Sequence, residues 1–393
     1  MNITDLHILE LDNFTVAVNH DTAAILKYKG NAHDVTVPSH VDGAPVAMID
    51  MGAFAGNRVL TSVTLPDTLR LIGVKAFYNC QSLCQVNIPD GVTQIGDDAF
   101  GFTALTNLIL PDSVTSVGKE AFARSSLKTV VIGKGLIELG AKIFYFDNEL
   151  ETILVDGGNP NFCVKDGVLF NSDQSVLLQY PNRRPGAAYA IPETVTTIAQ
   201  AAFAWNTGLK AVTIPDSIEI IGVDAFELSR LEEVTFSKHL RVIGDGAFAQ
   251  CFKLGNVEFP NSLKMIGKAA FCHNLSMTKI YIPDSVVHIG NCAFQLCTGV
   301  TEVFIGRNIA HIGYKAFSGT TFNPNESHHM GLRSFTVLNR TVPIDVFTFD
   351  FNPHLTLYGY ADNVTLKARA GSTMTFKAIP CNTVGVCQGH VSA

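Results

Sequence analysis

Apolar and polar positions along this chain follow one pattern that returns about every 23 residues. In one copy, Val257 and Phe259 alternate around the polar residue Glu258, and a proline follows. Gly267 and Phe271 stand seven and eleven residues after that proline. Alternation with a period of two predicts a short strand, and proline is tolerated at a strand end. A repeat of this length predicts a solenoid, because one coil cannot bury both of its faces and stacked coils share a continuous core.

The spacing inside the repeat shows which half of each coil is more regular. The segment from the Pro position to the Phe has a constant length, whereas the segment from the Phe to the next Pro position varies by one residue. The first half is therefore expected to stack in register, and the second half to contain a bend. We expect the Gly to supply a positive φ, and the Phe ring to point inward from a helical or irregular turn. The ten regular anchors are Phe77, Phe100, Phe122, Phe144, Phe203, Phe226, Phe248, Phe271, Phe294 and Phe317.

Two copies carry a clear family resemblance. Residues 88–100 read Ile-Pro-Asp-Gly-Val-Thr-Gln-Ile-Gly-Asp-Asp-Ala-Phe, and residues 214–226 read Ile-Pro-Asp-Ser-Ile-Glu-Ile-Ile-Gly-Val-Asp-Ala-Phe. These units resemble the leucine-rich repeats of the BspA type, also called the Treponema pallidum type, over roughly residues 35 to 360. The resemblance implies a right-handed solenoid of the α/β type, mostly β, with a parallel strand ladder. It also implies a surface or secreted role, since family members are often surface proteins that bind host or matrix proteins.

The repeat divides the chain into five segments. We predict an N-terminal β cap at 1–34, leucine-rich repeats at 35–150, a repeat with a hairpin insert at 151–190, further repeats at 191–320, and a degenerate repeat with a C-terminal cap at 321–393. Residues 14–18 and 24–28 are expected to pair as strands of the cap. Alternating runs on either side of Ser172 and Asp173 predict the hairpin, interpreted as a projection and not a domain boundary. Counting Phe54 and Phe347 as further anchors gives about twelve coils.

Composition excludes several classes of protein. Hydrophobic residues make up 47% of the chain, which excludes a disordered chain, and a net charge of −7 argues against nucleic-acid binding. No apolar run approaches the ~20 residues that span a membrane. The N-terminal stretch lacks the pattern of a secretory signal as it stands. A cytosolic protein, export by another route, and a signal replaced by Met all remain open.

The nine cysteines and several of the histidines and aspartates are candidates for chemical sites. Small polar or thiol residues occupy the position three residues after nine of the ten regular Phe anchors and are expected to face buried backbone at a bend: Cys80, Thr103, Ser125, Asn206, Ser229, Cys251, Asn274, Cys297 and Thr320. Asp residues after the prolines are expected to bond nearby backbone amides. His288 and His311 share an outward position in adjacent coils, but two imidazoles are a poor metal site, and no metal or cofactor is predicted. Cys381 and Cys387 could pair, and the sequence leaves this open.

The outward position inside the first strand of each coil varies most. It holds Thr64, Asn87, Ile109, Val131, Thr213, Thr235, Glu258, Tyr281 and Phe304 in order. Tyr281 and Phe304 are expected to be neighbours, with Lys279 and Glu302 beside them, which predicts a protein-binding site. Ile109 and Val131 form a second, weaker pair. The alternative is that the insert or the C-terminal segment covers these side chains.

These observations give two main hypotheses for function. The first is a non-enzymatic interaction protein, adhesin-like and located at the cell surface or secreted, which binds a host or matrix protein. The second is an intracellular scaffold or host-directed effector that binds a protein partner through the same surface. We expect a monomer without a cofactor. An enzyme is the third hypothesis, although motifs of common enzymes are absent. Its site would have to lie in the insert at 156–186 or the loop at 321–332, because only these segments interrupt repeat positions that serve packing.

Overall fold

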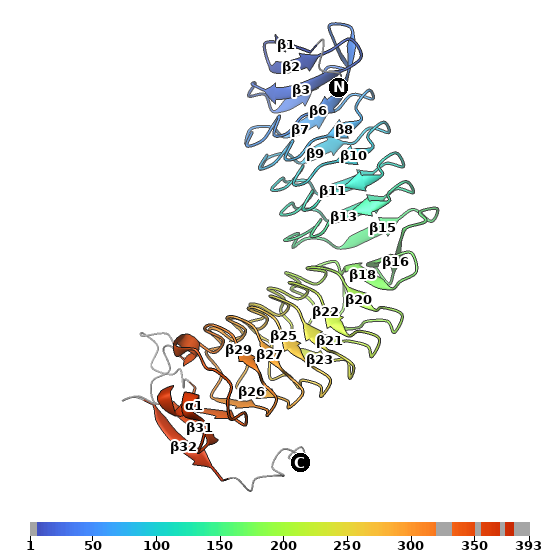
Figure 1. Cartoon of the computed structure of the whole chain (residues 1–393). Coiled ribbons are helices and arrows are strands. Elements are labelled where there is room, and N and C mark those ends of the chain that lie inside the picture. Colours follow the sequence, from blue (N-terminus) through green and yellow to red (C-terminus); the bar gives the residue numbers. More distant parts are fainter. Residues whose placement is uncertain (1–5, 320–331, 350–354, 370–373, 381–393) are drawn as a thin grey trace. The chain divides into compact units, whose positions relative to one another are not determined.

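The computed structural model describes residues 6–319, 332–349, 355–369 and 374–380. Contacts group the chain into two units. Unit 1 contains residues 1–185 and 199–208, and unit 2 contains residues 186–198 and 209–393. Each unit is a mostly-β solenoid in which short parallel strands stack from coil to coil, as Figure 1 shows. The described residues of the two units comprise about fourteen turns.

Unit 1 begins with an antiparallel cap and continues as parallel ladders. The cap consists of β1 (His7–Glu10), β2 (Phe14–Val18) and β3 (Ala23–Tyr28), which confirms the two predicted cap strands and adds a third. One ladder continues from β3 through β6 (Ala44–Ile49), β8 (Leu71–Ile72), β10 (Gln94–Ile95), β12 (Ser116–Val117) and β14 (Glu138–Leu139), and β5 (His40–Val41) pairs with β6. The other strands of these coils form two parallel sheets: β4 (Asp34–Thr36), β7 (Ser62–Thr64) and β9 (Gln85–Asn87), then β11 (Asn107–Leu110), β13 (Thr129–Ile132) and β15 (Thr152–Val155).

The insert of unit 1 is a three-stranded antiparallel meander. Its strands are β16 (Phe162–Lys165), β17 (Val168–Asn171) and β18 (Val176–Gln179). The pairing of β17 with β18 confirms the predicted hairpin around Ser172 and Asp173. The expected projection is wrong, because Val168, Leu169 and Phe170 are completely buried. Three consecutive apolar residues bury both faces of a strand and so draw it into the core.

Unit 2 repeats the same two ladders. One consists of β20 (Thr197–Ile198), β22 (Ile220–Ile221), β24 (Val242–Ile243), β25 (Met265–Ile266), β27 (His288–Ile289) and β29 (His311–Ile312). The other side of the coils carries β19 (Ala188–Ala190), β21 (Ala211–Thr213) and β23 (Glu233–Thr235), and then a five-stranded parallel sheet. That sheet contains β26 (Lys279–Ile282), β28 (Glu302–Ile305), β30 (Ser334–Val337), β31 (Thr356–Tyr360) and β32 (Thr375–Ile379). The short helices η2 (Val346–Phe349) and α1 (Val364–Arg369) lie between its last strands in sequence.

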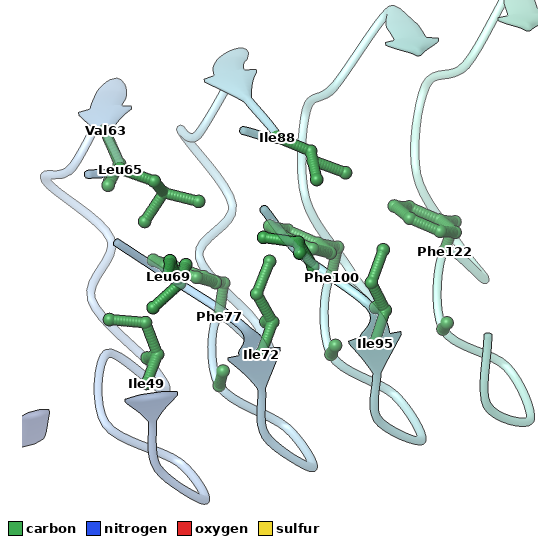
Figure 2. Packing of buried hydrophobic residues seen from close by; sticks show 14 of the residues in the cluster. Ile49, Val63, Leu65, Leu69, Ile72, Phe77, Ile88, Ile95, Phe100 and Phe122 are labelled. Carbon is green, nitrogen blue, oxygen red and sulfur yellow. The ribbon is translucent and has the colours of Figure 1, made fainter. Parts of the chain in front are cut away.

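A column of stacked phenyl rings runs through the core of each unit. In unit 1 the ring centroids of Phe77 and Phe100 are 5.1 Å apart, and those of Phe100 and Phe122 are 5.3 Å apart, with nearly parallel planes. Figure 2 shows these rings beside the inward isoleucines of the neighbouring strands. In unit 2 the rings of Phe248 and Phe271 repeat the arrangement at 5.2 Å. The separation approaches the ~4.8 Å spacing of adjacent strands, so the rings and the backbone stack with one period.

Two tyrosines explain why the count of about twelve coils was too low. Tyr28 stacks on Phe54 at 5.1 Å, and Tyr180 stacks on Phe203 at the same distance. Each tyrosine takes an anchor position in a coil that a search for phenylalanine alone does not find. The choice of Phe347 was wrong, because its side chain is 43% exposed, whereas Phe349 is buried against Phe335.

The turn around Phe54 and around each of the ten regular Phe anchors is irregular, not helical. The residues two before and two after the Phe adopt positive φ, as Asp98 (54°) and Phe102 (59°) do around Phe100. This backbone turns alternate N–H groups toward the next coil, so that Phe77 N donates to Ala99 O at 2.7 Å. A left-handed residue other than Gly costs roughly 1–2 kcal/mol. The hydrogen bonds and the buried ring hold the chain in this conformation.

The recurring Gly does not supply the positive φ that the sequence led us to expect. The φ angles of Gly96 and Gly267 are not positive, and the left-handed residue comes two positions later. A Cβ on Gly96 would lie 2.6 Å from the backbone N of Val74 in the preceding coil, and one on Gly267 would lie 2.6 Å from Asp245 N. Gly is needed here because adjacent coils touch backbone to backbone.

Polar side chains join the coils at two further positions. The residues three positions after the Phe were predicted to face buried backbone, and this is confirmed. Cys80 Sγ donates to Phe54 O at 3.1 Å, and Cys297 Sγ donates to Phe271 O at 3.0 Å. Burial raises the pKa of the Cys80 thiol to about 11. Three of the Asp residues after Pro, Asp112, Asp216 and Asp284, accept from a backbone N–H of the next coil, not of the local turn that was expected. Asp112 Oδ1 accepts from Lys134 N at 2.9 Å, and Asp216 Oδ1 accepts from Lys238 N at 2.9 Å.

We predict that Phe248→Ala destabilises the protein by about 3–5 kcal/mol, because it opens a cavity between two stacked rings in a fully buried column. Phe252→Ala is the matched control, since Phe252 lies four residues away and is 43% exposed. Its effect should stay within about 0.5 kcal/mol. Urea denaturation followed by circular dichroism measures both, and equal effects would show that the column is not what holds the coils together.

One buried carboxyl occupies the position three residues after an anchor. Asp147 is fully buried, Ser125 Oγ donates to its Oδ1 at 2.7 Å, and its Oδ2 has no hydrogen-bond partner among the described residues. Burial raises the pKa of Asp147 well above its usual value, against a smaller lowering effect of the Ser125 hydrogen bond. Because the folded-state pKa is the higher one, the protonated carboxyl favours folding at acid pH. This stabilisation is lost as the pH rises through the raised pKa.

Asp147→Asn should therefore raise the melting temperature at neutral pH, since Asn keeps the acceptor for Ser125 and carries no charge. The expected gain is about 1 kcal/mol or more at neutral pH and should shrink toward pH 4. Glu151→Gln, which changes an exposed carboxylate nearby, is the control. Thermal melts across this pH range measure the effect. A gain that does not vary with pH would contradict the assignment of a buried, charge-sensitive carboxyl.

Candidate protein-interaction surface

The predicted pair Tyr281 and Phe304 lies on the outer face of the five-stranded sheet of unit 2. Strands β26 and β28 are parallel and place the two residues directly opposite each other. Their ring centroids are 5.0 Å apart and their planes differ by 3°. Tyr281 is 47% exposed and Phe304 is half-buried, so the described residues leave the pair accessible. The structure thus brings together two aromatic rings that solvent reaches, in the arrangement that the sequence indicated.

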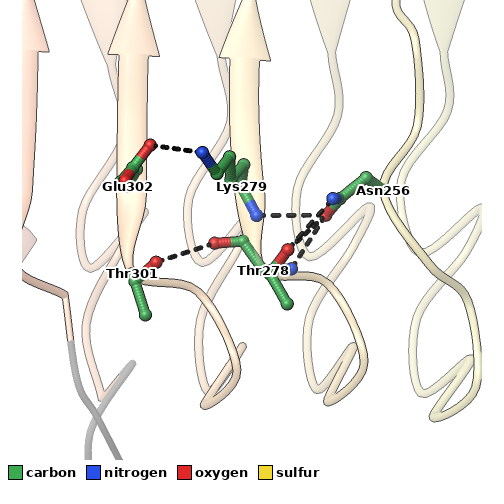
Figure 3. A network of polar contacts seen from close by, with 5 residues as sticks. All are labelled: Asn256, Thr278, Lys279, Thr301 and Glu302. Carbon is green, nitrogen blue, oxygen red and sulfur yellow. Dashed lines mark hydrogen bonds and ion pairs between the residues drawn. The ribbon is translucent and has the colours of Figure 1, made fainter. Parts of the chain in front are cut away.

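The charged neighbours of this pair also meet. Lys279 Nζ and Glu302 Oε2 are 3.0 Å apart, with both side chains more than half exposed. Figure 3 shows how Asn256 supports Lys279 from the preceding coil. Its Oδ1 accepts from the backbone N of Thr278 at 2.8 Å and of Lys279 at 3.0 Å. An exposed ion pair adds little stability. We therefore infer that this pair mainly orients the two long side chains beside the rings.

Tyr281 and Phe304 begin a row of outward residues that continues across the sheet, and the sequence did not identify this continuation. Register across the sheet aligns Phe304 with Thr336, Thr336 with Tyr358, and Tyr358 with Lys377. The 23-residue period fails after residue 319, so the row could not be followed by counting. The alternation Leu-Thr-Leu-Tyr at 355–358 was the available signal for a strand in this part of the chain.

The second predicted pair lies in unit 1. Ile109 and Val131 are opposite each other on β11 and β13, and Leu154 of β15 extends the row. Ile109 is 65% exposed and Leu154 is 50% exposed, whereas Val131 is half-buried. A hollow of about 610 Å³ lies beside this row, and Asn87, Pro89, Asp90 and Ile109 are among the residues that line it. The aliphatic row is a second accessible surface, without aromatic rings or an ion pair.

Other candidates for chemistry are placed as follows. The rings of His288 and His311 stack at 4.6 Å, and burial lowers the pKa of His288, with His311 adding to the effect. Within the described ranges, no group of three or more His, Cys, Asp or Glu residues could hold a metal ion. No described helix is long and apolar enough to cross a membrane. Cys381, Cys387 and residues 320–331 lie outside the described residues.

Comparison with known proteins decides the family. The family described as BspA type leucine rich repeat region matches in six copies, over residues 46–162, 187–272 and 220–326, which is more than half of the chain. This chain belongs to the BspA-type leucine-rich repeat family. A search of curated proteins gave no match. The family consists of protein-interaction repeats, which agrees with a structure whose recurring residues serve packing.

Several solved structures share the fold of this BspA-type protein. The pneumococcal vaccine antigen PcpA is 20% identical, with a TM-score of 0.69 and coverage of 96% of this chain and 100% of that chain. A leucine-rich repeat protein from Eubacterium ventriosum is 22% identical, with a TM-score of 0.66 and coverage of 82% and 97%. A leucine rich cell surface protein from Faecalibacterium prausnitzii is 28% identical, with a TM-score of 0.56 and coverage of 76% and 94%.

If the rings of Tyr281 and Phe304 are central to an interface, changing both to Ser should weaken partner binding at least about fivefold, which corresponds to about 1 kcal/mol. The melting temperature should stay nearly unchanged, because both side chains lie on an outer face. Thr213→Ala with Thr235→Ala is the matched control, since these exposed residues are neighbours on β21 and β23 of the same unit. Binding is measured by surface plasmon resonance. A large fall in melting temperature with intact binding would identify the rings as structural.

Proposed function

We propose that this protein acts by binding another protein and not by catalysis, as an adhesin-like protein at the cell surface or in secreted form. The observation that carries the proposal is the accessible stack of Tyr281 and Phe304 with the Lys279–Glu302 ion pair beside it. Aromatic residues in such positions are frequent hot spots of protein interfaces. The inner residues of each coil are occupied with packing, so the outer rows are where a partner can be recognised.

The location is supported by one of the related structures. The protein from Faecalibacterium prausnitzii is described as a cell surface protein, and it is 28% identical over 76% of this chain. Adhesion also suits a sheet that presents side chains at regular spacing, because a partner can be held by many shallow contacts. The partner proposed for this protein is therefore a host or matrix protein.

One observation favours an intracellular scaffold or effector as the second candidate. All seven described cysteines are free thiols, and Cys84 is exposed. Exposed free thiols are more common in reducing compartments than outside the cell. The buried Cys251 and Cys297 do not distinguish the compartments, because burial raises the pKa of each thiol to about 12 and makes it unreactive.

Surface labelling of intact source cells tests the location. An amine reagent that cannot cross membranes should label lysines of this protein on intact cells, while a cytosolic marker protein stays unlabelled. Mass spectrometry of the labelled peptides identifies the exposed coils and the N-terminal peptide of the natural protein. Labelling only after lysis would contradict the surface proposal and support the intracellular alternative.

Binding to immobilised matrix proteins tests the activity itself. The purified protein should bind at least one member of a panel of purified extracellular-matrix proteins. The variant with Tyr281→Ser and Phe304→Ser should bind that member at least about fivefold more weakly. If the wild-type protein binds no member of the panel, or the double variant binds equally well, this surface does not mediate adhesion.

A further inference from the structure

The outward row of the five-stranded sheet contains a gap between two aromatic rings. Strand pairing places Tyr281, Phe304, Thr336, Tyr358 and Lys377 in consecutive positions on β26, β28, β30, β31 and β32. Their inward neighbours, such as Val303, Phe335 and Leu357, are buried, which fixes the row on the outer face. Thr336 is the small residue in this aromatic stretch, and it separates Phe304 from Tyr358.

Two contacts fix how the rings on either side of Thr336 stand. Tyr281 and Phe304 stack with parallel planes at one strand spacing, so their faces point along the row and the free face of Phe304 is turned toward Thr336. Lys377 Nζ lies over the ring of Tyr358, 6.0 Å from its centroid. One face of Tyr358 is therefore turned toward β32 and the other toward Thr336.

The width of the gap suits one planar group. Phe304 and Tyr358 are two strand spacings apart, which is ~9.6 Å. A flat group halfway between them would lie ~4.8 Å from each ring, inside the ~6 Å over which a cation is attracted to an aromatic face. We name this space the Thr336 slot: it lies over Thr336, between the rings of Phe304 and Tyr358.

One carboxylate on the same outer face, Glu302, can pair with a cationic group. The outward residues of unit 2 include the exposed carboxylates Glu233, Glu258 and Glu302, against Lys279 and Lys377. Of the ion pairs that the described residues form, only Lys279 with Glu302 joins members of this set. Glu302 lies on the strand next to Thr336, opposite Ser334 and so two residues along the sheet from it, and its side chain is 52% exposed, which leaves it accessible to a second cation.

Beside the same sheet, a guanidinium already lies over the ring of a residue of β31. The guanidinium carbon of Arg340 is 4.3 Å from the centroid of Tyr360, and Arg340 also pairs with Asp362. This contact combines an aromatic face with a carboxylate. The Thr336 slot offers two faces, with Glu302 nearby. Arg suits such a site better than Lys, because its guanidinium is planar and weakly hydrated and stacks on rings.

We propose that the Thr336 slot receives an arginine side chain of the partner protein, stacked between Phe304 and Tyr358 and paired with Glu302. This inference rests on the proposed function, since it specifies which residue the partner presents to this surface. The slot makes the surface selective for arginine-bearing segments, whereas the Tyr281–Phe304 stack supplies the apolar contact next to it.

Fluorescence anisotropy with labelled peptides tests the slot on the full chain. The probe is a short Gly/Ser peptide with several arginines, and matched peptides carry lysine or citrulline at the same places. The arginine peptide should bind at least about fivefold more tightly than the lysine peptide, and the citrulline peptide should bind least. Equal binding of the arginine and lysine peptides would overturn the proposal, because it would show general attraction to negative charge.

Variants of the protein test the position. Thr336→Tyr fills the slot and should weaken binding of the arginine peptide at least about fivefold, whereas Thr336→Ser leaves it open and should bind as the wild type does. Thr213→Tyr is the matched control, because it adds the same ring to an exposed threonine of β21. Circular dichroism checks that each variant is folded. Glu302→Gln provides a second measurement that adds no bulk, and it should also weaken arginine binding. Unchanged binding by both Thr336→Tyr and Glu302→Gln would overturn the slot.

The outcome can be separated from a failure of the proposed function. The double change Tyr281→Ser and Phe304→Ser removes the apolar stack, whereas Thr336→Tyr keeps it. If the double change weakens binding of a matrix protein and Thr336→Tyr does not, the interaction surface stands and the arginine slot is wrong. If both changes weaken binding of the matrix protein, and Thr336→Tyr weakens binding of the arginine peptide but not of the lysine and citrulline peptides, the slot is supported.

Discussion

The structure depends on the match between the spacing of stacked strands and the spacing of stacked phenyl rings. Each coil must sit about one strand spacing from the next, because the backbone hydrogen bonds between coils require it. The anchor rings obey the same spacing, at 5.1 Å between Phe77 and Phe100 and 5.2 Å between Phe248 and Phe271. The recurring Gly follows from this close spacing, because the adjacent coil leaves no room for a side chain at that position. A Cβ at Gly96 would push adjacent coils apart and disturb the ring column and the hydrogen bonds together.

This constraint explains the unusual backbone around each anchor. A helical turn would direct its N–H groups along its own axis, and the coil could not bond its neighbour. Left-handed residues on both sides of the Phe instead turn alternate N–H groups toward the next coil. The cost of each left-handed residue is repaid only when another coil is present, so the conformation belongs to the stack and not to the single repeat.

The same constraint leaves the outer rows free to vary. Inward positions hold the same few apolar residues from coil to coil, whereas the outward row holds Thr213, Glu258, Tyr281 and Phe304 in turn. Because strands pair in register, residues about 23 positions apart become neighbours, and a surface is built from side chains that are remote in sequence. Recognition in this BspA-type protein therefore depends on which residues occupy equivalent positions in adjacent coils.

The sequence by itself determined the repeat, the ring column, the cap strands, the hairpin around Ser172 and Asp173, and the meeting of Tyr281 with Phe304. These follow from periodicity, because a constant spacing brings equivalent positions together in space. Tertiary structure alone decided three matters. Tyr28 and Tyr180 complete the ring column, because burial in the stack depends on shape and not on residue name. Gly serves close approach between coils, because the obstruction comes from a residue one coil earlier. The row continues through Thr336 and Tyr358, because strand pairing across the five-stranded sheet persists where the spacing in the sequence does not.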